Sequence, residues 1–243
     1  MSPTATEGGA RTGSAVVGRY RTLPGFARSW LRIAALGSTF CSIYIIFGLG
    51  NVLGLYVPLE TEYFYALVAL LLPLAFLIYP AVASKRDRVP WYDTALAVAS
   101  FAVPAYFAYS GNAILEDGWE YDAPRHGIYL AFVLWGLVLE ATRRAGGNAI
   151  FVICLVVSVY PIFSHFAPGF LEGDPVAPVI TAGFHIFGTE SILGIPMGAF
   201  ANLVIGFLVF GVALQFTGGG EFFLNLAFSL LGRRRGGPAK VAI

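Results

Sequence analysis

Long apolar segments alternate with short polar connections along most of the chain. Six such segments can be read, at about residues 33–57, 63–83, 92–110, 126–141, 148–166 and 192–217. A helix needs about 20 residues to cross a hydrocarbon core of about 30 Å, because it rises about 1.5 Å per residue. The pattern therefore predicts an all-α, polytopic transmembrane protein with about six spans.

A short amphipathic segment follows the sixth apolar segment. Gly218–Gly220 break the pattern, and the polar residues Glu221, Asn225 and Ser229 then recur every four positions among phenylalanines and leucines. A helix of about 12 residues is about 18 Å long and too short to span a bilayer. Because Arg233–Arg235 follow, we predict a short interfacial helix that starts and ends on the same side of the membrane.

The basic residues fix an expected orientation. Of the 15 Lys and Arg residues, only Arg125 lies outside the amino-terminal tail, the second and fourth connections and the carboxyl end. Lys and Arg stay on the cytoplasmic side, so we predict a cytoplasmic amino terminus and a cytoplasmic tail over 1–32. The opposite connections are acidic; they hold Glu60, Glu62, Glu116, Asp117, Glu120, Asp122, Glu172, Asp174 and Glu190.

The composition agrees with a membrane protein. The chain is 57% hydrophobic and 12% charged, whereas soluble domains carry about a quarter charged residues. A formal net charge of +1 without an aromatic-rich basic patch indicates no nucleic-acid partner. Cys41 and Cys154 lie in separate apolar segments, where a thiol is typically a packing residue.

The sequence shows no arrangement suited to catalysis. No Ser/His/Asp set, Cys-x-x-Cys motif or pair of carboxylates inside one segment occurs, and His126, His165 and His185 are too far apart to predict a metal site. Glu140, Arg143 and Arg144 are spaced for a local ion pair at the inner end of the fourth segment. We therefore predict no enzyme, no metal site and no covalently bound cofactor.

One polar stretch is a candidate docking loop for a partner. Glu116, Asp117 and Glu120 lie in the second outer connection, where their charge could steer an approaching protein. The other interpretation is a solvated loop that simply follows the charge asymmetry of the chain. Both interpretations stay open at the level of sequence.

The carboxyl-terminal half carries recognisable motifs, which are Gly194–Gly198 (GIPMG), Phe207–Gly211 (FLVFG), Thr217–Phe223 (TGGGEFF) and Gly232–Ala242 (GRRRGGPAKVA). They resemble the opening of the large permease subunit of TRAP (tripartite ATP-independent periplasmic) transporters. Leu139–Arg144 (LEATRR) is similar to fused small-plus-large permeases of the TAXI type. The resemblance covers about residues 130–243, and residues 1–125 agree in architecture alone.

The resemblance implies a domain organisation. Residues 33–146 would be a four-helix, small-subunit-like membrane domain. Residues 147–190 would hold a linking transmembrane helix and a periplasmic loop, and 191–243 would begin the large permease domain. The chain would thus be an amino-terminal fragment of a longer permease.

The resemblance also implies a function and partners. It implies cation-coupled uptake, usually with sodium, of organic acids that a periplasmic binding protein delivers, at the inner (cytoplasmic) membrane of a bacterium. The partners would be the lipid bilayer, the binding protein and the remaining helices of the large permease domain. Substrate and sodium sites of that family lie later in the large subunit, so we expect them beyond Ile243 and assign no binding residue. The alternative from the residues alone is a non-transporting structural or anchoring membrane subunit.

Overall fold

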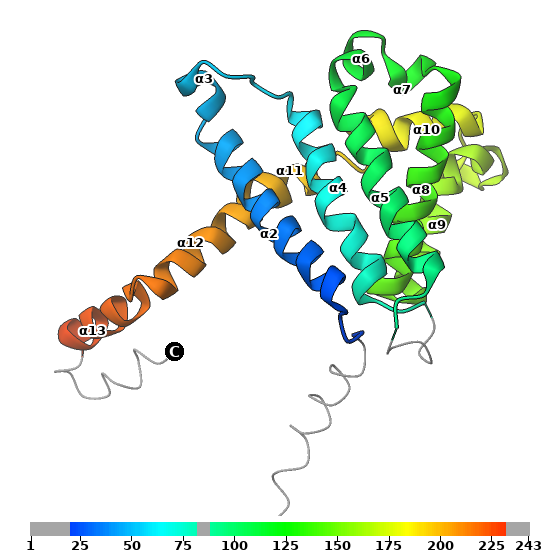
Figure 1. Ribbon diagram of the computed structural model, residues 1–243. Helices are drawn as coiled ribbons and strands as arrows, with labels where there is room; N and C mark the ends of the chain where they lie inside the picture. Colours follow the sequence, from blue (N-terminus) through cyan, green and yellow to red (C-terminus); the bar gives the residue numbers. More distant parts are fainter. Residues whose placement is uncertain (1–19, 82–87, 232–243) are drawn as a thin grey trace, which may run out of the picture. The chain divides into compact units, whose positions relative to one another are not determined.

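The computed structural model describes residues 20–81 and 88–231, which form helices joined by short connections, with no strand among them (Figure 1). The predictions on the tail before residue 20, on Lys85 and Arg86, and on Arg233–Arg235 lie outside the described residues. The chain divides into two units, Met1–Gly198 and Ala199–Ile243. Each unit is described by itself.

The first unit is built on five long helices: α2 (Gly25–Ile46), α4 (Glu60–Ile78), α5 (Trp91–Tyr109), α8 (Arg125–Gly146) and α9 (Asn148–Phe163). Helix α4 packs against α2, α5 and α8, and α8 also packs against α5 and α9 (Figure 1). The start of α2, the end of α4, the start of α5 and the end of α8 lie together, and we call this the Arg21 end. The opposite end, with the short helices α6 (Gly111–Glu116) and α7 (Trp119–Asp122), is called the Trp119 end.

Among residues 20–81 and 88–231, four helical stretches are long and apolar enough to cross a membrane: Gly25–Ile46, Glu60–Ile78, Asn148–Phe166 and Ile195–Phe216. They correspond to the first, second, fifth and sixth predicted segments. Helices α5 and α8, with 19 and 22 residues, are long enough but less apolar. Since both pack against α4 and against each other, part of their surface meets protein and need not be apolar. The all-α class is confirmed for the described residues, and the count of six spans stays a prediction.

Small residues let α2 approach α4 closely. The buried positions of α2 are Ala27, Ala34, Ser38 and Ser42. Ser42 Oγ lies 2.7 Å from the hydroxyl of Tyr63 on α4. Small side chains at a helix interface are typical of membrane proteins, where close backbone contact replaces the hydrophobic effect between helices.

The predicted bounds of the first segment, 33–57, are wrong at both ends. Helix α2 begins at Gly25 and ends at Ile46, because Gly48 adopts the left-handed conformation (φ 58°). The short helix α3 (Leu49–Leu53) follows and ends at Gly54, which is also left-handed (φ 64°). The arginines Arg28 and Arg32 therefore lie within the helix and not in a tail before it.

The fourth segment, predicted as the shortest at 126–141, is also longer than expected. Helix α8 continues to Gly146. Charged residues are compatible with its last two turns, because Glu140 pairs with Arg143 and Arg144, and Arg144 also pairs with Asp93 on α5.

The connection between the fifth and sixth predicted segments, expected to hold a periplasmic loop, contains a helix. Two short 3-10 turns, η1 (Ser164–Phe166) and η2 (Gly169–Leu171), precede α10 (Pro178–Phe187), which packs against α7, α8 and α9. Proline at the first position starts α10. Ile186 and Phe187 are buried, and the Tyr65 hydroxyl donates to the Ile186 carbonyl at 2.7 Å.

The last candidate span, Ile195–Phe216, ends within the second unit. The helical run from Ile195 comprises α11 (Ile195–Ala199), a π-helical turn η3 (Phe200–Val204) and α12 (Ile205–Phe216). Gly218 is left-handed (φ 73°) and separates α12 from α13 (Gly219–Leu231). The predicted short helix after the glycines is thus confirmed as a helix, while its place at the membrane interface stays a prediction.

Candidate functional site

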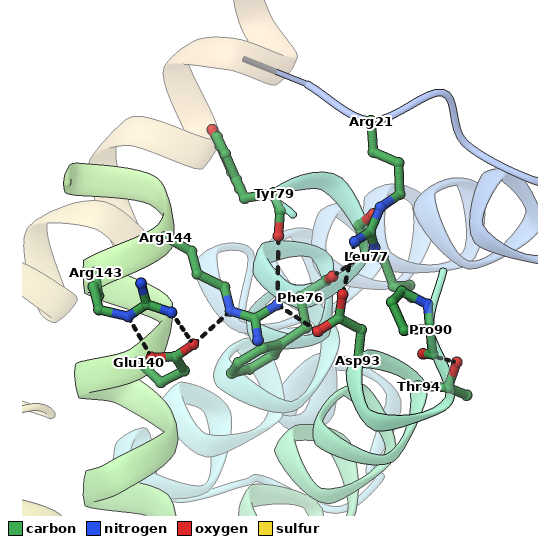
Figure 2. Close-up of polar contacts among 10 residues, drawn as sticks. All are labelled: Arg21, Phe76, Leu77, Tyr79, Pro90, Asp93, Thr94, Glu140, Arg143 and Arg144. Atoms are coloured by element: carbon green, nitrogen blue, oxygen red, sulfur yellow. Dashed lines mark hydrogen bonds and ion pairs between the residues drawn. The ribbon is translucent and has the colours of Figure 1, made fainter. Parts of the chain in front are cut away.

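Asp93 lies between two arginines at the Arg21 end of the bundle (Figure 2). Its Oδ2 accepts a hydrogen bond from Arg21 Nη2 at 2.7 Å, and its Oδ1 accepts one from Arg144 Nη1 at 2.7 Å. The side chains of Arg21 and Asp93 are 0% exposed and that of Arg144 is 2% exposed. A single carboxylate thus binds two guanidiniums away from water.

The start of α5 places Asp93 in this position. Pro90 precedes the helix, and Asp93 belongs to its first turn, where a negative charge is favourable next to the free N–H groups. The backbone N–H of Asp93 and the hydroxyl of Thr94 both donate to the Pro90 carbonyl, at 3.1 and 3.4 Å. The carboxylate therefore projects from a well-defined turn.

The end of α8 supplies Arg144 together with a second acid. Glu140 accepts two hydrogen bonds from Arg143, both at 2.7 Å, and one from Arg144 Nε at 2.8 Å. The Arg144 guanidinium also lies 5.0 Å from the ring centroid of Phe76, a cation–π contact. The predicted local pairing of Glu140 with Arg143 and Arg144 is confirmed, and it extends to Asp93.

Arg21 joins the segment before α2 to the end of α4. Its Nη1 donates to the carbonyls of Phe76 and Leu77 at 3.3 and 3.4 Å, and its backbone N–H donates to Ile78 at 3.0 Å. Carbonyls in the last turn of a helix lack partners within that helix, so Arg21 caps α4. Its Nε is buried without a partner.

The cluster of Arg21, Asp93, Glu140, Arg143 and Arg144 is suited to holding helices together and not to catalysis. It contains three guanidiniums and two carboxylates, and each carboxylate oxygen accepts a hydrogen bond from an arginine. Removing one partner of such a buried pair leaves an uncompensated buried charge, which lowers the free energy of unfolding strongly. The cluster therefore fixes the register of α4, α5, α8 and the segment before α2.

Asp93 and Arg21 were not predicted as site residues from the sequence. A signal existed for Asp93, because besides Glu140 it is the only Asp or Glu within the six predicted apolar segments. An acid inside such a segment needs a partner. For Arg21 there was no signal, since it is one of several arginines before the first segment.

The structure places the candidate docking residues at the Trp119 end. Glu116 and Asp117 are exposed where α6 ends, whereas Glu120 on α7 is half-buried beside α10. Between them Trp119 is 5% exposed, with its ring 5.6 Å from that of Phe187. The stretch from Glu116 to Glu120 is therefore anchored by Trp119 and presents two exposed carboxylates. Its role in docking stays a prediction.

The histidines make local contacts. His185 Nε2 lies 2.8 Å from the Ser158 carbonyl and its Nδ1 lies 2.8 Å from Ser191 Oγ, while His126 Nε2 lies 3.0 Å from the Tyr106 hydroxyl. Within residues 20–81 and 88–231, no group of three or more His, Cys, Asp or Glu side chains is arranged to hold a metal ion.

Four candidate spans among the described residues, together with the buried ion-pair cluster of the first unit, are typical of a multi-pass membrane protein. Residues 133–243 match the family described as Tripartite ATP-independent periplasmic transporter, DctM component. The match covers most of α8, then α9 and α10, and the second unit. Neither the curated proteins nor the solved structures include a significant match to the chain.

This match supports a membrane component of a TRAP transporter in the carboxyl-terminal part of the chain. The matched family is a transporter family and not an enzyme family, which fits a non-enzymatic role. Together with the apolar helices, the match supports a multi-pass membrane protein.

Proposed function

We propose that the chain is the membrane permease component of a secondary active TRAP transporter. The transporter takes up organic acids that a periplasmic binding protein delivers, and an ion gradient, with sodium as the coupling ion, drives the uptake. The observation that carries this proposal is the family match over residues 133–243. Sodium and the substrate class rest on the resemblance of the motifs to that family.

In this proposal the first unit is a rigid support. Helices α2, α4, α5 and α8 form the part similar to the small subunit of a fused TAXI-type permease, and α9 links it to the large permease part. Both ends of this four-helix part lie at the Arg21 end, which is the cytoplasmic side if basic residues stay inside. The buried cluster around Asp93 supports this role, because it locks three of the four helices to one another.

The alternative function is a non-transporting structural or anchoring membrane subunit. One observation favours it: the buried ionisable groups of the first unit make hydrogen bonds and ion pairs that hold helices together. The two functions differ in whether the periplasmic side recognises a substrate-loaded partner.

A binding measurement separates the two functions. The chain is placed in lipid nanodiscs and exposed to the purified, secreted binding protein whose gene neighbours its own. A transport component binds that protein, and the affinity changes when the protein is loaded with its organic acid. An unrelated periplasmic binding protein is the control. If the neighbouring genes encode no such protein, or if it binds no better than the control, the anchoring function is favoured.

A further inference from the structure

A pocket of about 310 Å³ lies between α2, α4 and α5 at the Trp119 end of the bundle. Its walls include the aromatic rings of Phe40, Tyr44, Tyr56 and Tyr63, and the side chain of Glu62. An aromatic enclosure with one carboxylate is the arrangement that recognises an ammonium group, because both the ring faces and the carboxylate attract a cation.

Glu62 is a buried carboxylate without a cationic partner among the described residues. The residue is 6% exposed and belongs to the first turn of α4. Its Oε2 accepts hydrogen bonds from the Tyr56 hydroxyl at 2.7 Å and from the Leu59 N–H at 3.0 Å. Its Oε1 has a single long contact, 3.5 Å to Asn112 Nδ2, so this oxygen keeps the capacity to accept a stronger donor.

The surroundings of Glu62 hold the carboxylate in place. A Cβ atom on Gly111 would overlap Glu62 Cγ and would lie 2.8 Å from Oε1, so glycine is required behind the carboxylate. The Tyr44 hydroxyl on α2 donates to the Tyr56 carbonyl at 2.6 Å, which joins the segment before α4 to α2. The carboxylate is thus backed by α6 and lines the pocket.

The pocket is continuous with the apolar surface of a candidate span. Phe40 on α2 is 66% exposed and Tyr56 is 61% exposed, and both line the pocket. Apart from Glu62 and the tyrosine hydroxyls, the walls are apolar. Aromatic side chains at the end of a span lie at the level of lipid headgroups, so a membrane lipid is the molecule that meets this surface.

We infer that the pocket binds the ammonium headgroup of a phospholipid, with Glu62 as its counter-ion and the tyrosine rings around it. A primary ammonium such as that of phosphatidylethanolamine donates to the Glu62 carboxylate and packs against the ring faces. The acyl chains lie along the exposed apolar side of α2. The ammonium thereby neutralises a buried acid that has no cationic partner among the residues the structure describes. This site is independent of the proposed transport function.

Lipid retention in nanodiscs tests the assignment. The chain is reconstituted in phosphatidylethanolamine or in phosphatidylglycerol with the same acyl chains, extracted in mild detergent, and the bound lipids are counted by native mass spectrometry. We expect one retained phosphatidylethanolamine and at least about tenfold less retained phosphatidylglycerol, the effect of one charge-assisted hydrogen bond.

Three variants make the test specific. Glu62→Gln should lower phosphatidylethanolamine retention at least about tenfold, whereas Glu116→Gln, an exposed acid at the same end, should leave it unchanged. Tyr56→Phe keeps the ring and removes a competing donor to Glu62, so it should retain the lipid at least as well as the native chain. Thermal unfolding in lipid-free detergent shows whether each variant is folded.

The assignment is overturned if the native chain retains both lipids equally, or if Glu62→Gln, shown to be folded, retains phosphatidylethanolamine as Glu116→Gln does. It is also overturned if Glu62→Gln weakens binding of the secreted binding protein while lipid retention is unchanged. That result would assign the pocket to a cationic side chain of a protein partner.

Discussion

Arg144 donates a hydrogen bond to Asp93 across 2.7 Å, and both side chains are almost completely buried. This contact joins the last turn of α8 to the first turn of α5. Since Asp93 also binds Arg21, one carboxylate connects three parts of the chain that are far apart in sequence. Asp93 is therefore the carboxylate that connects α5 both to α8 and to the segment before α2 at the Arg21 end.

Replacing Asp93 should destabilise the first unit strongly. Asp93→Asn leaves the buried guanidinium of Arg21 without a negative partner and leaves Arg144 paired with Glu140 alone. The loss of one partner of a buried ion pair costs about 3–5 kcal/mol. The free energy of unfolding, measured by thermal or denaturant unfolding in detergent, should fall by an amount of that order.

Two matched variants control this prediction. Asp122→Asn removes an exposed acid and should change stability little. Arg143→Gln removes a guanidinium that is 32% exposed and pairs with Glu140 alone, so its cost should be below about 1 kcal/mol. An Asp93→Asn variant as stable as Asp122→Asn would show that the buried cluster does not hold the helices together.

Apolar runs predicted the existence of most long helices, because a bilayer demands such runs whatever the tertiary contacts are. Helices α4, α5, α9 and the run Ile195–Phe216 lie close to their predicted segments. The start of α2 could not be predicted in this way, since Arg28 and Arg32 are exposed on the helix and look like a polar tail.

Tertiary contacts explain what the sequence did not predict. Helix α10 lies in a segment rich in proline and glycine that resembles a loop. One side of α10 is buried, because Gly183 permits close contact with α7. The pairing of Asp93 with Arg21 and Arg144 joins residues 72 and 51 positions apart, which no local pattern specifies. The local set of Glu140, Arg143 and Arg144 was predictable, because its members are three or four residues apart on one helix.

Gly183 should not tolerate a larger residue. A Cβ atom at this position would lie 2.8 Å from the backbone carbonyl oxygen of Glu120, so Gly183→Ala must displace α10 from α7. Overpacking of this kind costs about 1–3 kcal/mol, which should appear as a lower unfolding temperature.

Gly136→Ala is the matched control for this prediction. Gly136 lies in α8 with no atom within 4 Å of an added Cβ, so alanine should be neutral or stabilise the helix by about 0.5–1 kcal/mol. Equal stability of Gly183→Ala and Gly136→Ala would contradict the close packing of α10 on α7.

The orientation predicted from the basic residues can be tested by cysteine labelling. In a background without Cys41 and Cys154, single cysteines are introduced at Glu116, Asp174 and Arg88, which are all exposed. If basic residues stay inside, an impermeant reagent added to intact cells should label positions 116 and 174 and leave position 88 unlabelled. Labelling of position 88 without position 116 would reverse the orientation.

The exposed carboxylates of the α6–α7 turn should affect the rate of partner association. If the turn steers the binding protein, the Glu116→Gln, Asp117→Asn double variant should slow its association at low salt and have little effect at high salt, because exposed charges are screened. Glu172→Gln with Asp174→Asn, exposed acids of another connection, is the control. Unchanged association kinetics and salt dependence would favour a solvated turn without a docking role.

Solute uptake tests the proposed transport function most directly. Right-side-out membrane vesicles from cells that express the complete gene encoding this chain are supplied with the neighbouring binding protein and its radiolabelled organic acid. The proposal predicts accumulation that requires both the binding protein and an inward sodium gradient and that continues without ATP. Accumulation that ignores the gradient or the binding protein, or no accumulation beyond vesicles lacking the gene, would contradict it.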